Sequence, residues 1–243
     1  MRVSLTPSFI LHQRPYKETS LIVDVFTREY GRISLVARGV RRNRKKSQGL
    51  FQANRNLNIS WSGRGEMGTL TEIEANGPGI ELKGEAMIAA FYLNELIIRL
   101  LHKHESHPEL FDAYMVALTR LEHGQSELVA LRYFEKQLLD SLGYGLVLDH
   151  EIDTTEPIDP GRRYFYIINR GPCAVKPENC GFVEISGSNL LALEREDFDD
   201  QSSLDEVKQL MRTTLNGYLG DRPLASRDLF RAYAQQKQKH RLL

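Results

Sequence analysis

The sequence has little of what marks secreted or membrane proteins. Its 243 residues include two cysteines, Cys173 and Cys180, which cannot form a disulfide framework, so we expect a reducing, cytoplasmic compartment. The most apolar stretch, residues 86 to 101, is interrupted by polar and charged side chains, whereas a membrane-spanning helix needs about 20 apolar residues. Residues 1 to 15 lack the apolar core and cleavage site of a secretory signal. We therefore expect neither a membrane anchor nor a disulfide-stabilised domain.

The sequence also lacks the motifs that usually mark an enzyme. We find no Ser-His-Asp or Cys-His arrangement with recognisable flanks, no phosphate loop and no marked pair of carboxylates. Residues 63 to 68 fit the pattern G-x-G-x-x-G, but an alternating strand pattern follows them instead of a helix. We interpret them as a glycine-rich connection between strands and predict neither catalytic residues nor a cofactor.

Candidate metal ligands are too few in any one region. Cys173 and Cys180 provide half of a structural zinc site, which needs four ligands. A histidine cluster lies just before Pro108, at an expected helix end that would separate the side chains; it consists of His102, His104 and His107. We interpret the cluster as a solvated helix terminus and predict no metal site.

What the sequence does have is a separation of charge that its formal net charge of zero hides. It contains 32 Lys and Arg residues and 32 Asp and Glu residues. Residues 1 to 60 hold 12 basic and 3 acidic residues, a balance of +9, which leaves 20 basic and 29 acidic residues, a balance of −9, for the remainder. Such an asymmetry predicts a polyanionic partner for the basic part.

The first 80 residues read as short strands. Apolar and polar residues alternate with the period of two that is typical of half-buried strands. The runs are residues 8 to 12, 20 to 27, 32 to 38, 57 to 61 and 69 to 75. Five short strands in this length favour a small closed barrel, and the oligonucleotide-binding (OB) barrel is the leading candidate.

Beyond residue 79 the apolar pattern becomes helical. Helices are predicted over residues 84 to 104, 108 to 121, 126 to 142, 203 to 220 and from 226 onward. Ser203 and Glu206 have the spacing of a capping box. We predict an α+β protein, in which a five-stranded OB-fold domain, residues 1 to 80, precedes an α-helical bundle domain, residues 81 to 243, with a loop-rich insertion at about 150 to 185.

The strongest functional signal is a basic segment that contains no acid, residues 38 to 46. It has six positive charges in nine residues. One interpretation is a phosphate-binding arm, whose affinity comes from displaced counterions; the other is a solvated loop that aids solubility. Four aromatic residues of the same domain could stack bases, although each taken alone is more typical of a core. They are Phe26, Tyr30, Phe51 and Trp61.

Several short motifs in a fixed order resemble one known family. They are HQRPYKETS at residues 12 to 20, VDVFT at 23 to 27, LVARG at 35 to 39, YLNEL at 92 to 96, LRYFE at 131 to 135, LGYG at 142 to 145 and YLGDRPLASRDLF at 218 to 230. Together they resemble RecO, the bacterial recombination mediator, in its gammaproteobacterial form. The resemblance covers nearly the whole chain.

The resemblance implies a DNA-binding protein of repair and recombination without a catalytic centre. RecO-like proteins bind single- and double-stranded DNA, anneal complementary strands, bind the acidic C-terminal tail of single-stranded DNA-binding protein, and work with RecR to load RecA. It also implies a cytoplasmic, nucleoid-associated location. Some relatives carry a four-cysteine zinc module, of which this sequence keeps only Cys173 and Cys180.

These considerations select the site residues. We predict phosphate contacts from eight basic residues: Lys17, Arg38, Arg41, Arg42, Arg44, Lys45, Lys46 and Arg55. We expect Arg132 to contact the tail of single-stranded DNA-binding protein; the alternative is a surface arginine paired with Glu135. The rival function is an RNA-binding or protein-binding OB-fold adaptor, which composition does not separate from a DNA-binding protein.

Overall fold

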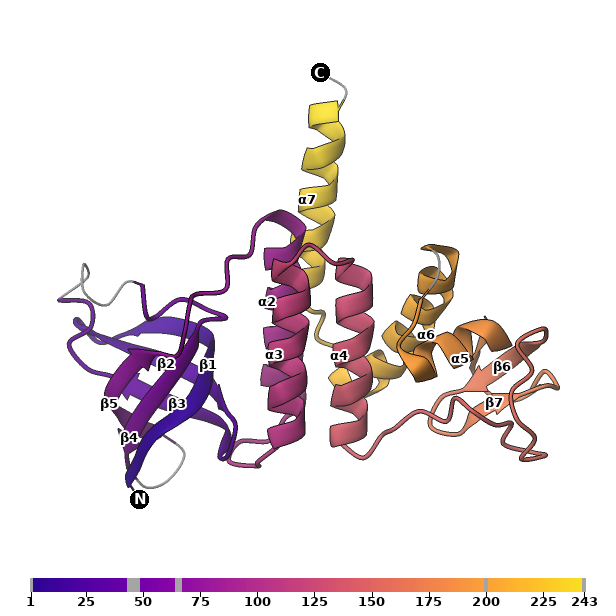
Figure 1. The fold of residues 1–243 in the computed structure, drawn as a ribbon, viewed down its shortest axis with the longest axis horizontal. Helices are drawn as coiled ribbons and strands as arrows, with labels where there is room; N and C mark the ends of the chain where they lie inside the picture. The colour runs from indigo at the N-terminus through magenta and orange to yellow at the C-terminus, as the bar shows by residue number, and fades with distance from the viewer. Residues whose placement is uncertain (1, 43–48, 64–66, 199–200, 242–243) are drawn as a thin grey trace. The chain divides into compact units, whose positions relative to one another are not determined.

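The N-terminal strands close into the predicted five-stranded barrel (Figure 1). The computed structural model describes residues 2–42, 49–63, 67–198 and 201–241. The strands are β1 (Arg2–Tyr16), β2 (Ser20–Thr27), β3 (Gly31–Ala37), β4 (Asn56–Ser62) and β5 (Met67–Ala75). They are ordered β1-β2-β3-β5-β4, with only β3 and β5 parallel, and their inward-facing side chains form an apolar core that includes Val23, Leu35 and Ile59.

Strand β1 is much longer than the predicted run of residues 8 to 12. Its first half pairs with β4 and its second half with β2, and the register shifts between Val3 and Thr6 and again between Ile10 and His12. Each β-bulge inserts an extra residue and reverses the alternation of faces. A simple period of two therefore detects only the middle of this strand.

Three of the described helices share a compact unit with the barrel. The unit comprises Met1–Gly124 and Leu224–Leu243 and is called the barrel unit below. Its helices are α2 (Gly84–Leu100), α3 (Pro108–Glu122) and α7 (Ala225–Arg241). The carboxylate of Glu95 on α2 caps α7, because it accepts hydrogen bonds from the backbone N–H groups of Ala225 and Ser226, at 2.9 Å each, and from the Ser226 hydroxyl at 2.6 Å. The chain thus returns to the barrel unit after residue 223.

Helix α3 packs on the outside of the barrel. Phe9 of β1 and Phe26 of β2 point away from the barrel interior, and their rings lie 5.2 and 5.5 Å from the ring of Phe111. Next to them, the Arg28 guanidinium donates two hydrogen bonds, of 3.0 and 2.7 Å, to the Asp112 carboxylate. These hydrogen bonds hold the pKa of the Asp112 carboxyl below its usual range.

A buried polar cluster fixes the chain where it re-enters the barrel after the basic segment. Asn54, which has a positive φ of 65°, donates from its side-chain amide to the Tyr114 hydroxyl and to Asn94 Oδ1. The Tyr114 hydroxyl donates to Asn94 Oδ1 at 2.5 Å, and the Asn94 amide donates to the Leu11 carbonyl at 3.1 Å. The cluster joins β1, α2, α3 and the segment before β4.

The second unit, Gln125–Pro223, contains the remaining elements. They are α4 (Glu127–Ser141), β6 (Arg163–Ile167), β7 (Gly171–Cys173), β8 (Phe182–Ser186), α5 (Gly187–Arg195) and α6 (Gln201–Leu219). The predicted insertion holds a three-stranded antiparallel sheet in the order β7-β6-β8. Helix α6 contacts α4, α5 and β8.

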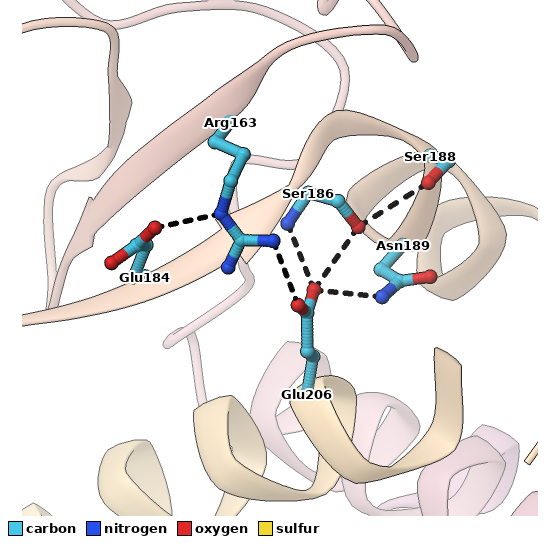
Figure 2. Close-up of polar contacts among 6 residues, drawn as sticks. All are labelled: Arg163, Glu184, Ser186, Ser188, Asn189 and Glu206. Atoms are coloured by element: carbon cyan, nitrogen blue, oxygen red, sulfur yellow. Dashed lines mark hydrogen bonds and ion pairs between the residues drawn. The ribbon is translucent and has the colours of Figure 1, made fainter. Parts of the chain in front are cut away.

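The predicted capping box of Ser203 and Glu206 is wrong, because α6 already begins at Gln201. Glu206 instead stabilises the start of α5 (Figure 2). One of its carboxylate oxygens accepts hydrogen bonds of 2.8 to 3.0 Å from the Ser186 N–H, the Ser186 hydroxyl and the Asn189 side-chain amide. Its other oxygen accepts from Arg163, which also donates to Glu184. A carboxylate from one helix thus caps another.

The two units divide the charge of the chain. The barrel unit contains 22 basic and 14 acidic residues, a balance of +8, and the second unit contains 10 basic and 18 acidic residues, a balance of −8. The basic C-terminal segment belongs to the barrel unit, so the division follows the compact units and not only the position along the chain.

Candidate nucleic-acid interface

Basic side chains gather at one end of the barrel, around the hairpin that joins β1 to β2. The turn begins at Lys17, whose φ of 52° is left-handed, and β2 begins at Ser20. The Lys17 ammonium lies 5.4 Å from the centre of the Tyr16 ring, a cation–π contact. The turn therefore presents a cation and an aromatic ring together.

The start of the basic segment docks on this turn. The Arg41 N–H donates to the Thr19 carbonyl at 3.0 Å, and Arg41 Nη1 donates to the Lys17 carbonyl at 3.2 Å. A further bond from the Arg42 N–H to the Gly39 carbonyl, 3.1 Å, closes a turn within the segment. These bonds bring together residues that are 24 positions apart in the sequence.

Four of the eight predicted phosphate contacts meet at this place. Lys17, Arg38, Arg41 and Arg42 are all exposed, and we call them the tip cluster. Arg44, Lys45 and Lys46 lie outside the described residues, so their predicted role stays a prediction. Because the residues of the tip cluster lie on or next to two adjoining turns, neighbouring phosphates of one nucleic-acid strand could contact several of them at once.

Arg55 lies elsewhere. It is half-buried at the start of β4, next to Asn54, whose N–H bonds the Ile10 carbonyl at 2.9 Å. Its guanidinium packs against Gly79, and its Nε is buried without an acceptor among the described residues. The hairpin tip lies six residues farther along β1 than Ile10. The structure does not bring Arg55 into the tip cluster.

Two residues near the tip were missed by the sequence reasoning. Arg14 is exposed on β1 opposite Ile22, and Tyr16 is partly exposed opposite Ser20. The motif that contains both was recognised, but the first strand was expected to end at His12. Extending β1 to Tyr16 places both side chains on the outer face of the barrel, next to the turn that carries Lys17.

The four aromatic residues considered for base stacking belong to the packed interior. Phe26 and Trp61 are buried, as is Phe51. Tyr30 packs edge-on against Trp61, with ring centres 5.2 Å apart. The interpretation of these residues as core is confirmed. A different aromatic side chain, Tyr16, lies at the basic end of the barrel beside Lys17.

Arg132 is buried and does not lie on the surface. Its Nη2 donates to Glu135 Oε1 at 2.6 Å, and only 6% of the Arg132 side chain and 1% of the Glu135 side chain are exposed. Arg132 Nε and Nη1 have no acceptor within the described part of the chain. Two nitrogens of the guanidinium therefore lie in a buried environment without a described acceptor.

Within the part of the chain that the structure describes, the cysteines and histidines form no cluster of ligands. Cys173 is buried, with its sulfur 3.2 Å from the carbonyl oxygens of Phe165 and Val175, whereas Cys180 is exposed. Burial raises the pKa of the Cys173 thiol, which disfavours the thiolate that binds metals. Across the described ranges, no group of three or more His, Cys, Asp or Glu side chains could hold a metal ion.

Among the residues that the structure describes, no helix has the length and the apolar character needed to cross a membrane.

Comparison with known proteins matches nearly the whole chain. The family model "Recombination protein O N terminal" matches residues 1–78, and "Recombination protein O C terminal" matches residues 82–228. A protein of Nitrosococcus oceani named DNA repair protein RecO is 47% identical over 229 residues, which covers 94% of this chain and 93% of the relative. A protein of the same name from Coxiella burnetii, strain RSA 331, is 46% identical over 230 residues, 94% of this chain and 98% of the relative. Another from Nitrosospira multiformis is 43% identical over 235 residues, 96% and 97% of the two chains.

Proposed function

Because the chain belongs to the RecO family of DNA repair proteins, we propose that it is a recombination mediator whose barrel unit binds DNA and anneals complementary strands. The family assignment confirms the resemblance found in the sequence, and a general role in DNA repair and recombination follows from it. The finer steps of the proposal rest on the residues described above.

The observation that carries the proposal is the tip cluster. Lys17, Arg41 and Arg42 are exposed, and hydrogen bonds from Arg41 to the carbonyls of Lys17 and Thr19 hold their two turns together. Cations gathered in this way displace counterions from phosphates and bind without sequence preference. This chemistry suits single- and double-stranded DNA alike.

Annealing requires two polyanionic strands to approach one another. A unit with a balance of +8 lowers their mutual repulsion at the place where the strands would meet. The step needs no nucleotide hydrolysis, so a protein without a catalytic centre can perform it.

The second unit would recruit DNA that carries single-stranded DNA-binding protein. The tail of that protein combines acidic residues, an apolar side chain and a free carboxylate. Arg132 offers two guanidinium nitrogens without a described acceptor, and buried apolar residues of α4, Leu131 and Leu138, lie on its helix. A carboxylate that reached Arg132 would complete its hydrogen bonds and compete with Glu135.

We further propose that the protein works with RecR to load RecA onto such coated DNA. Family membership supports this step. The barrel unit would hold the DNA strand while the second unit holds the coat protein, which would concentrate the partners at the same stretch of DNA.

The DNA-binding proposal is tested by replacing Arg41 and Arg42 with alanine in the full chain. The log–log salt slope of single-strand binding should become shallower by about 1 to 1.5, since each phosphate contact contributes about 0.7. The matched control replaces Arg170 and Arg195, two exposed arginines of the second unit, and should keep the slope. An unchanged slope in the Arg41 and Arg42 variant would contradict the proposal, and stronger binding of RNA than of DNA of equal length would favour an RNA adaptor.

The tail proposal needs a variant that remains folded. Arg132→Met together with Glu135→Gln removes both buried charges at nearly constant volume, and Glu135→Gln alone keeps the arginine. A peptide with the sequence of the tail should bind the Glu135→Gln variant but not the double variant. The double variant should also fail to anneal coated strands. Wild-type peptide affinity in the double variant would exclude Arg132 as the contact.

A further inference from the structure

The outer face of the first three strands can be divided into rows by the strand register. Val23, Leu35 and other residues of the core point inward, so their neighbours in the sequence point outward. From one end to the other, the outward rows are Phe9, Phe26 and Arg32; then His12, Asp24 and Ser34; then Arg14, Ile22 and Val36; then Tyr16 and Ser20, with Arg38 directly after β3.

The first row is occupied by the helices of the same unit. Phe9 and Phe26 pack against α3, and the Arg32 guanidinium donates hydrogen bonds of 3.3 and 3.1 Å to the Leu101 carbonyl at the end of α2. Barrels of this type usually bind oligonucleotides across strands 2 and 3. Here helix α3 covers Phe26, so an oligonucleotide cannot lie on this end of β2 and β3.

The second row carries an acid. Asp24 Oδ1 accepts a hydrogen bond of 2.6 Å from the Ser34 hydroxyl, and Asp24 Oδ2 lies 3.9 Å from His12 Nδ1. A carboxylate in the middle of the face repels phosphates. It separates the part covered by helices from the rows beyond it.

The third and fourth rows carry basic side chains and are partly open. Arg14 and Arg38 are exposed and Val36 and Tyr16 are partly exposed, whereas Ile22 and Ser20, the β2 members of these rows, are buried. Lys17 adds its charge next to the Tyr16 ring. A partly exposed ring beside arginines is a combination that binds single strands, in which bases stack and phosphates contact cations.

We propose that the exposed side chains of this half of the face form a binding site for single-stranded nucleic acid, with a base stacked on Tyr16 and phosphates contacting Arg14 and the tip cluster. The strand leaves the barrel at Asp24 and does not continue along β2 and β3. The two open rows are about 7 Å apart, so the site holds only a few nucleotides. The proposal rests on the DNA-binding function above and specifies where the strand lies.

Stacking on Tyr16 is tested with full-length variants and an oligonucleotide that contains 2-aminopurine. Tyr16→Ala should weaken single-strand binding about tenfold and abolish the fluorescence quenching that stacking causes, whereas Tyr16→Phe should retain both. Tyr144→Ala, which removes an exposed tyrosine of the second unit, is the control and should bind like wild type.

The contributions of the Arg14 and Asp24 charges are tested by removing each charge and comparing a matched control. Arg14→Ala should lower the salt slope by about 0.7, while Arg2→Ala, an exposed arginine at the other end of β1, should leave it unchanged. Asp24→Asn should tighten binding severalfold because it removes the repulsion, and Glu109→Gln on α3 should not.

The outcomes separate this site from the general function. If Tyr16→Ala, Arg14→Ala and Asp24→Asn all bind like wild type while the Arg41 and Arg42 variant loses affinity, the proposed site is wrong and DNA binding by the tip cluster stands. If the wild-type protein binds no oligonucleotide, the proposed function itself fails. Circular dichroism and thermal midpoints equal to those of wild type establish that each variant is folded.

Discussion

Gly31 lies directly against the backbone of Glu105: a Cβ atom added at Gly31 would be 1.7 Å from the Glu105 carbonyl oxygen. The contact belongs to a larger docking of the β2–β3 hairpin on the segment between α2 and α3. The His104 N–H donates to the Arg32 carbonyl at 3.0 Å, and the Ser106 hydroxyl lies 3.4 Å from the Arg28 carbonyl. Together with the packing of Phe9 and Phe26 on Phe111, this docking holds the helices over the first row of the barrel face.

Gly31→Ala should therefore destabilise the barrel unit by about 3 kcal/mol or more, since it adds a clash with backbone atoms to a left-handed φ of 65°. Gly39 provides a matched control, because its φ is 70° and nothing lies within 4 Å of an added Cβ. Gly39→Ala should cost about 1 kcal/mol from conformational strain alone. Urea unfolding followed by the fluorescence of Trp61 measures both, and equal costs would contradict the role of the contact.

The barrel could be predicted because β2 and β3 alternate without interruption. The run also contained a sign of the covering helix that was not used: Phe26 stands on the same face as Asp24, where a solvated strand would carry a polar residue. An apolar residue in that position indicates a second layer, which is α3. The alternation of apolar and polar residues does not identify the element that covers this face of the strand.

The candidate site was only partly predictable, because a count of charges says nothing about where side chains pack. Arg41 reaches the hairpin turn through hydrogen bonds to Lys17 and Thr19, which depend on how the strands pair. Arg55 has the same charge but packs against Gly79. Glu206 has the spacing of a capping box but caps a different helix, because tertiary contact overrides a local pattern.

Tyr114→Phe should lower the free energy of unfolding by about 1 to 3 kcal/mol, because it removes the hydroxyl that donates to Asn94 and accepts from Asn54 in a buried cluster. Tyr144→Phe is the control, since Tyr144 is exposed. Urea midpoints of the two variants give the difference. If both variants unfold at the wild-type midpoint, the cluster contributes nothing to stability.

The same tyrosine predicts a loss of stability in alkali. Burial raises the pKa of the Tyr114 phenol far above its ordinary value, so the folded state keeps the proton that the unfolded chain loses above about pH 10. The contribution is complete below that pH and declines as the pH rises, by up to about 1.4 kcal/mol per pH unit. Between pH 9 and 11 the wild type should therefore lose stability faster than Tyr114→Phe; parallel curves would refute the assignment.

Arg132→Ala should be strongly destabilising whatever the protein binds. Removing the guanidinium leaves the buried Glu135 carboxylate without this ion pair, which typically costs about 3 to 5 kcal/mol. Arg132→Met combined with Glu135→Gln should recover most of the loss, since no buried charge remains. Thermal unfolding of the three proteins decides the point, and a double variant as unstable as the single one would show that packing, not charge, determines the cost.

Glu206 should make the second unit sensitive to acid. Although burial tends to raise its pKa, hydrogen bonds from Ser186, Asn189 and Arg163 hold the pKa below the ordinary value. The carboxylate therefore stabilises the folded state above about pH 4.3 and ceases to do so as the pH falls through the lowered value. At pH 7, Glu206→Gln should cost about 1 to 2 kcal/mol, measured by hydrogen exchange of the α5 amides, and the difference from wild type should narrow on acidification.

Glu184→Gln is the control: this half-exposed carboxylate also bonds Arg163, at 2.7 Å, and its loss should change the exchange by less than about 0.5 kcal/mol. Equal effects of the two substitutions would mean that Arg163, and not the cap of α5, is what Glu206 supports.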